Sequence, residues 1–193
     1  HRNEVPAGNE VVLFRHEKTF YNKPGLFIRL RDDESAEQIQ EKIAPAEAYS
    51  VNYVGIDLVL DGFAVESVSN DPAAFAAAVK TARAASEKPL ILISRDPDVM
   101  AAGLGQADGA MIYAADSDNW ESMAALAKEH KTSLAVVAGT LDGLADLTEK
   151  VKGAGVEDMV IDPDTSDLSA SLAFGTQIRR QALKKNYRPL GYP

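Results

Sequence analysis

The chain has 193 residues, of which 46% are hydrophobic, so it can bury the core of one sizeable α/β domain or two small ones. Its 29 acidic and 20 basic residues give a net charge of −9, which argues against nucleic acid or an anionic membrane surface as a partner. The absence of cysteine excludes disulfides, thiolate metal sites and any cysteine-held cluster within this chain.

Apolar runs of strand length alternate with helical patterns along the sequence. Most of these runs are continuous, which is typical of strands covered on both faces in a parallel sheet. The predicted strands are 25–31, 53–60, 89–94, 110–114, 134–138 and 158–162. A further short run at 11–14 (VVLF) predicts a lead-in strand that covers the bottom of a barrel.

Several helices between these strands have recognisable start signals. An N-cap Asp before Pro, a capping-box pair and an N-cap Thr each satisfy free N–H groups in a first helical turn. The predicted starts are Asp71-Pro72, Asp96-Pro97, Asp118 with Glu121, and Thr140. The last helix is predicted over about 167–185 and ends in a basic turn, which favours the helix dipole.

Repeated βα units with right-handed crossovers form either a doubly wound sheet or a closed barrel. Six units are visible, and a TIM-type barrel has eight. We therefore expect a single domain over 1–193, with a lead-in strand and loop at 1–24 and βα units at 25–193, and the pattern alone supports only these repeated units. The first and sixth strands would be edges, which are a liability unless another segment or chain pairs with them.

Ligand sites in such folds lie at the carboxyl ends of the strands. Four polar residues that follow predicted strands are candidates for such a site: Asp61, Arg95, Asp116 and Asp162. Carboxylates there could bind a metal ion or act as acid and base. They belong to a larger set of polar residues after the strands, which also includes Asp32, Asp33, Ser94, Asp96, Thr140 and Asp164. Most of this set precedes a helix by one or two residues, so N-capping accounts for it without chemistry.

No residue is assigned a catalytic, cofactor-binding or metal-binding role. The sequence contains neither a GxGxxG motif nor a GxxxxGK motif followed by Ser or Thr, and its three histidines have no metal-ligand spacing. No apolar run approaches the roughly 20 residues needed to span a bilayer.

A dense polar cluster after the VVLF run is a second candidate surface. It contains both signs of charge, and its candidate interaction residues are Arg15, His16, Glu17, Lys18 and Asn22. It is either a docking or substrate-facing loop, or a solvated hairpin between the lead-in strand and the first barrel strand.

The same cluster lies within a stretch that resembles a known family. GNEVVLFRHEKTFYNKPGLFIRL (8–30), MIYAADSDNWESMAALAKEH (111–130) and TQIRRQALKKNYRPLGYP (176–193) resemble, in the same order, segments of corrinoid/iron–sulfur protein large subunits. The resemblance covers nearly the whole chain and is carried most specifically by RHEKTF, AADSDNW and TQIRR…YRPLGYP.

The resemblance implies that this chain is the central barrel of the large, or gamma, subunit. The expected fold is then an incomplete α/β TIM-type barrel, with about six of eight βα units. In that family an N-terminal domain carries a four-cysteine iron–sulfur cluster and a C-terminal domain binds a corrinoid, so neither cofactor is expected on these residues. The family passes a methyl group from methyltetrahydrofolate, through a methyltransferase, to acetyl-CoA synthase in the reductive acetyl-CoA pathway. The implied partners are the small subunit, the methyltransferase and acetyl-CoA synthase, in the cytoplasm.

Three hypotheses for function remain open at this point. The first is a scaffold and interaction domain that is not catalytic alone. The second is a free-standing barrel enzyme, such as a pterin-dependent methyltransferase or an aldolase-like lyase, with Asp61, Arg95, Asp116 and Asp162 around its mouth. The third is an α/β binding module without a known relative. Binding of methyltetrahydrofolate would separate the enzyme from the scaffold.

Overall fold

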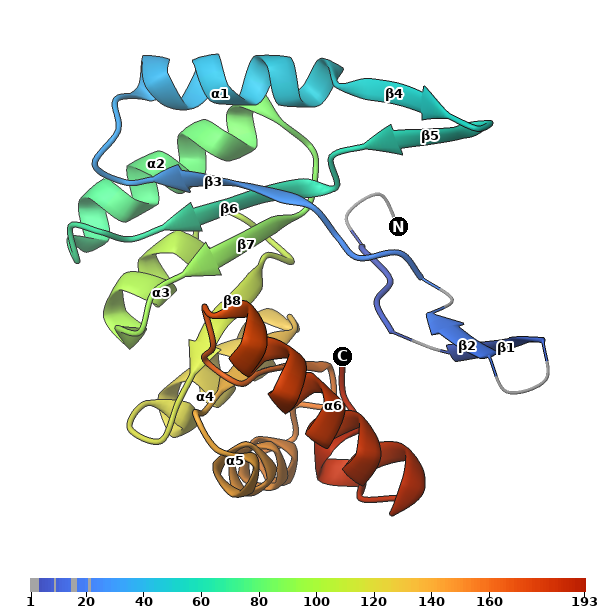
Figure 1. Cartoon of the computed structure of the whole chain (residues 1–193). Coiled ribbons are helices and arrows are strands. Elements are labelled where there is room, and N and C mark those ends of the chain that lie inside the picture. Colours follow the sequence, from blue (N-terminus) through green and yellow to red (C-terminus); the bar gives the residue numbers. More distant parts are fainter. Residues whose placement is uncertain (1–3, 9, 15–16, 21) are drawn as a thin grey trace.

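The computed structural model describes residues 4–8, 10–14, 17–20 and 22–193. Six parallel strands form its main sheet, in the spatial order β10-β9-β8-β7-β6-β3 (Figure 1). The strands are β3 (Phe27–Arg31), β6 (Gly62–Glu66), β7 (Leu90–Ile93), β8 (Met111–Ala115), β9 (Leu134–Val137) and β10 (Met159–Asp162). Each strand lies beside the one that precedes it along the chain, without the reversal of strand order that defines a doubly wound sheet. The prediction of an incomplete TIM-type barrel is therefore confirmed.

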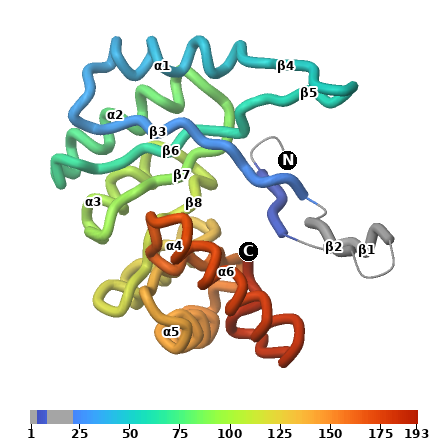
Figure 2. The backbone as a smooth tube through the Cα atoms, in the orientation of Figure 1, coloured from blue at the N-terminus to red at the C-terminus, as the bar shows by residue number. Residues whose placement is uncertain are grey.

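Each strand of this sheet is followed by a helix, and the helices lie on the outside of the curved sheet (Figure 2). The helices are α1 (Ala36–Ala48), α2 (Pro72–Ala85), α3 (Pro97–Leu104), α4 (Trp120–His130), α5 (Leu141–Gly153) and α6 (Leu168–Lys184), and a 3-10 turn, η1, covers Arg188–Leu190. Among the described residues, no helix is long and apolar enough to cross a membrane.

The core lies between the sheet and its helices. Phe63 and Leu92 from the strands and Phe75 and Met100 from the helices are fully buried and belong to one cluster. Gly103 lets α3 approach α2 closely, because a Cβ atom there would lie 2.4 Å from the ring of Phe75. Small residues in this layer therefore set the helix spacing.

The local start signals of the helices are mostly confirmed. The side chains of Asp71, Asp96 and Thr140 each accept a hydrogen bond from the first turn of α2, α3 and α5. The predicted capping box at Asp118 is wrong, because α4 begins at Trp120 and has Asn119 as its N-cap residue.

The predicted strand at 53–60 is also wrong. This segment is the greater part of an antiparallel hairpin, β4 (Ser50–Tyr53) and β5 (Ile56–Val59), which turns at Val54 and Gly55. Both turn residues have positive φ, as in the two-residue turns that suit the twist of a hairpin. The strand that joins the main sheet is β6, whose shorter sequence GFAVE begins with a glycine.

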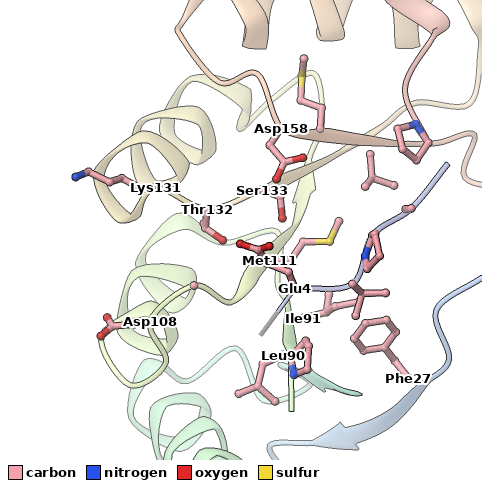
Figure 3. A pocket seen from close by; sticks show the side chains of 18 residues that line it. Glu4, Phe27, Leu90, Ile91, Asp108, Met111, Lys131, Thr132, Ser133 and Asp158 are labelled. Atoms are coloured by element: carbon pink, nitrogen blue, oxygen red, sulfur yellow. The ribbon is translucent and has the colours of Figure 1, made fainter. Parts of the chain in front are cut away.

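The N-terminal segment forms a second hairpin, β1 (Glu10–Phe14) and β2 (Glu17–Phe20). The predicted strand at 11–14 is therefore confirmed, whereas its predicted position over the bottom of the barrel stays a prediction. Residues 4–7 of this segment reach the bottom of the barrel. Together with Leu90, Met111 and Met159 they line a cavity of about 900 Å³ at the amino ends of the strands (Figure 3).

The first and sixth strands of the sheet, β3 and β10, are its edges, as predicted. The outer side of β10 is partly satisfied by the end of the chain, because Ile161 N–H donates a hydrogen bond of 2.8 Å to the carbonyl oxygen of Pro193. The last residue therefore lies beside β10.

Candidate functional site

Polar side chains meet at the carboxyl ends of β7, β8 and β10. The Arg95 guanidinium lies 2.7 Å from an Asp116 carboxylate oxygen and 4.0 Å from one of Asp164. The Tyr113 hydroxyl donates a hydrogen bond of 2.7 Å to Asp162. We call these five residues the strand-end cluster.

Backbone hydrogen bonds fix the loops that carry this cluster. One Asp116 carboxylate oxygen accepts from the N–H groups of Asp118 and Asn119, at 2.9 and 3.2 Å. The Asn119 side-chain amide donates to the carbonyl oxygen of Arg95 at 2.8 Å, which ties the loop after β8 to the loop after β7. The Arg95–Asp116 ion pair thus joins two loops that the Asn119 hydrogen bond already holds together.

The electrostatics of the cluster favour ion pairing. Burial raises the pKa of Asp116, but hydrogen bonds from Asp118 N–H and from Arg95 outweigh this effect and lower it overall. The hydrogen bond to Asp116 raises the pKa of Arg95. Burial, followed by the hydrogen bond to the Asp162 carboxylate, raises the pKa of Tyr113, so its hydroxyl remains a donor well above neutral pH.

The groups in this cluster are largely satisfied by one another. Asp116 is held ionised between a guanidinium and two backbone N–H groups, which suits it to a structural tether and not to general acid catalysis. Asp162 accepts from Tyr113 with one oxygen and from Asp164 N–H with the other. Arg95 and Asp164 keep side chains that are more than half exposed, so they are the members that a ligand would meet first.

Asp61 does not belong to this cluster, and its predicted place at the carboxyl end of a sheet strand is wrong. It precedes β6 and therefore lies at the amino ends of the strands, because 53–60 is a hairpin. There its carboxylate accepts from Lys23 Nζ at 2.6 Å and from Leu26 N–H at 2.8 Å. Burial raises the pKa of Asp61, but the hydrogen bonds from Lys23 and Leu26 lower it overall.

A buried carboxylate follows β3 at the carboxyl end of the barrel. Asp32 accepts hydrogen bonds from the Ser67 and Ser69 hydroxyls and from the N–H groups of Val68 and Ser69, at 2.6–3.0 Å. It thereby holds the loop that leaves β6. Sequence reasoning missed Tyr113, whose only signal was a hydroxyl within an otherwise apolar strand.

The structure describes only some of the predicted interaction residues after β1. Arg15 and His16 lie outside the described residues, and Glu17 and Lys18 lie in β2. The Asn22 side-chain amide donates to the carbonyl oxygen of Gly8 at 3.4 Å, so it closes the base of this hairpin. Whether these residues form an interaction surface stays a prediction.

Within the described part of the chain, no group of three or more His, Cys, Asp or Glu side chains is placed to hold a metal ion.

Comparison with known families decides the kinship of the chain. A family model described as CO dehydrogenase/acetyl-CoA synthase delta subunit matches residues 1–193. The chain belongs to this family.

Curated relatives in this family agree with the predicted resemblance to large subunits. The corrinoid/iron–sulfur protein large subunit of Moorella thermoacetica is 39% identical over 191 residues, covering 98% of this chain and 43% of the relative. The gamma subunit of the acetyl-CoA decarbonylase/synthase complex of Archaeoglobus fulgidus is 37% identical over 198 residues, covering 99% and 42%. The subunit gamma 2 of the acetyl-CoA decarbonylase/synthase complex of Methanosarcina mazei is 42% identical over 161 residues, covering 82% of this chain and 34% of the relative. The chain spans less than half the length of these relatives.

Solved structures confirm the barrel fold of this family member. Dihydropteroate synthase of Thermus thermophilus, a TIM barrel, matches with a TM-score of 0.61 at 16% identity, covering 92% of this chain and 73% of that one. The same enzyme in complex with 6HMPPP matches with a TM-score of 0.62 at 18% identity, with the same coverage. At this identity the likeness concerns the fold.

Proposed function

We propose that this chain is the barrel of the large subunit of a corrinoid/iron–sulfur methyl carrier. The carrier would accept a methyl group from methyltetrahydrofolate through a methyltransferase and deliver it to acetyl-CoA synthase, in the cytoplasm and paired with a small subunit. The observation that carries the proposal is a family match along all 193 residues, with relatives named as corrinoid/iron–sulfur large subunits and as gamma subunits of one complex.

The residues of this chain do not fit the iron–sulfur cluster of such a carrier. A four-cysteine cluster has no ligand here, because the chain has no cysteine. In this proposal both cofactors are held by other parts of the longer subunit, and the barrel serves as a scaffold between them.

The satisfied state of the strand-end cluster supports a scaffold role. Arg95 and Asp116 bind each other and the adjoining loops, so they hold the mouth of the barrel in shape. We expect that Arg95→Ala with Asp116→Ala in the full-length subunit leaves the rate of methyl loading onto the corrinoid within about threefold of the unsubstituted protein. Stopped-flow absorbance of the corrinoid measures that rate. A loss of more than about a hundredfold in an intact, assembled carrier would place chemistry at this mouth and overturn the scaffold role.

The second candidate function is a pterin-dependent methyltransferase. One observation favours it: Arg95, Asp116 and Asp162 do converge at the carboxyl end of the barrel, where TIM-barrel enzymes bind their substrates. Calorimetric titration with methyltetrahydrofolate separates the two functions. Tight binding that disappears in Arg95→Ala would support the enzyme, whereas the scaffold predicts no binding to this barrel.

A further inference from the structure

The hairpin β4–β5 carries one wholly apolar face. In its ladder Val51 lies opposite Leu58 and Tyr53 lies opposite Ile56, so all four side chains point to the same side. They are 44%, 43%, 67% and 64% exposed in that order. We call these four residues the hairpin patch.

The other face of the same hairpin is mainly polar. It carries Ser50, Asn52, Asp57 and Val59, and the Asn52 amide donates to the Asp57 carboxylate at 2.7 Å. The alternation is the one expected of a ribbon whose apolar face packs on something. In this hairpin the apolar face is exposed to solvent. The polar face carries the hydrogen bond between Asn52 and Asp57, which stabilises the ribbon.

The base of the hairpin is held firmly. The Lys88 ammonium donates to the carbonyl oxygen of Leu60 at 2.7 Å, and Asp61 binds Lys23 and Leu26 N–H. On the other side, Tyr49 N–H bonds the last turn of α1 at Ala46. Figure 1 shows the ribbon extending beyond the end of α1, away from the helices that cover the sheet. The patch is therefore presented from a fixed support, which lowers the entropy lost on docking.

We propose that the hairpin patch docks against an uncharged, apolar surface of another subunit of the complex that contains this protein. This inference rests on the proposed function, which supplies the complex. The patch lies at the amino ends of the barrel strands, because the hairpin directly precedes β6. The strand-end cluster lies at the opposite ends, so docking here leaves the mouth of the barrel accessible.

The size and charge of the patch select this occupant over a second copy of the chain. Burying the four side chains removes on the order of 400 Å² from water, about half of the ~800 Å² per partner that a standard stable interface needs. A second copy would also bring another charge of −9 to the contact. A patch without charged side chains offers nothing to phosphates or lipid headgroups. It fits instead the anchor of a larger interface with an apolar subunit surface.

The first test measures subunit association with the full-length protein. Tyr53→Ser with Ile56→Ser removes the two most exposed members of the patch, and Val59→Ser on the opposite face of β5 is the matched control. We expect the double variant to bind one purified partner subunit at least about tenfold more weakly in calorimetry, and the control to stay within about twofold. Unchanged affinity of the double variant for every subunit of the complex would overturn the proposal.

The second test identifies what lies on the patch. A photo-crosslinking amino acid replaces Tyr53 in the full-length protein, the complex is assembled and irradiated, and the crosslinked peptides are sequenced by mass spectrometry. Crosslinks to a different subunit support the proposal. Crosslinks confined to the same polypeptide or to a second copy, or binding of the protein to neutral lipid vesicles that Tyr53→Ser abolishes, would overturn it.

Methyl loading is measured in the same preparations, so that the two proposals can fail separately. An unsubstituted protein that does not load a methyl group contradicts the proposed function. A protein that loads normally, and whose double variant still assembles with unchanged affinity, contradicts the docking proposal alone.

Discussion

β6 and the hairpin that precedes it are both short apolar segments, yet they differ in how far their side chains are buried. Phe63 and Val65 of β6 are fully buried, whereas Ile56 and Leu58 of β5 are about half exposed. β6 has a hydrogen-bonded neighbour on each side, β3 and β7, and β5 pairs with β4 within the described part of the chain. Burial here therefore follows the number of neighbouring strands and helices and not the apolar content of the strand.

The largest expected difference between the two regions concerns packing. Phe63→Ala should lower the free energy of unfolding by about 3–5 kcal/mol, because it leaves a cavity in the main core. Ile56→Ala should change it by less than about 0.5 kcal/mol, because its side chain is already mostly in water. Urea denaturation followed by circular dichroism measures both. Equal effects would mean that the hairpin patch packs within the folded chain, and they would contradict this prediction.

Two glycines, one in each region, offer a second contrast. A Cβ atom on Gly62, the first residue of β6, would lie 2.3 Å from the carbonyl oxygen of Pro89, so Gly62→Ala must shift the β6–β7 pairing. We expect a loss of about 2–3 kcal/mol. Gly55 in the hairpin turn has open space around it but a φ of +80°, so Gly55→Ala should lose only about 1 kcal/mol through backbone strain. Thermal melts of both variants would show the order, and the reverse order would contradict it.

The carboxylate of Asp32 holds the loop at the other end of β6. Burial raises its pKa, but hydrogen bonds from Ser69, Val68 and Ser67 outweigh this effect and lower it overall. A folded-state pKa below the unfolded value stabilises the protein fully above about pH 3.9, and this stabilisation is lost as the pH falls through the folded-state pKa.

The variant Asp32→Asn should therefore lower the free energy of unfolding by about 2 kcal/mol at pH 7, because a buried acceptor is replaced by an amide that cannot accept from four donors. The deficit should shrink as the pH falls below about 4. Denaturation curves between about pH 2.5 and 7 measure this trend. Asp57→Asn on the exposed hairpin is the control, and a deficit that stays constant with pH would contradict the assignment.

Sequence reasoning succeeded where the cause of a structure is local. Asp71, Asp96 and Thr140 cap helices through bonds that reach only two or three residues along the chain, so their spacing is sufficient to predict them. The alternation of strands and helices, and the family resemblance, likewise carried the prediction of the barrel.

The failures concern partners that are distant in sequence. The run at 53–60 is more strand-like than GFAVE, and only the pairing of β6 with β3 and β7 decides which one enters the sheet. Because of that error, Asp61 was predicted at the carboxyl ends of the barrel strands, whereas it lies at their amino ends. The contact between Tyr113 and Asp162 joins residues 49 positions apart, which no local pattern encodes.

A smaller effect is expected for the segment between the two regions compared above. Lys23 and Leu26 N–H both bind Asp61, the residue between the hairpin and β6. Lys23→Ala should lower the free energy of unfolding by only about 0.5 kcal/mol, because its side chain is more than half exposed and the ion pair is screened by solvent. Asp61→Ala should lower it by about 1–2 kcal/mol, because Leu26 N–H also loses its acceptor.

Urea denaturation of the two single variants and of the double variant measures the coupling between Lys23 and Asp61. If the double variant loses no more than Asp61→Ala alone, the lysine acts only through this carboxylate. Additive losses would instead show that Lys23 stabilises the chain elsewhere.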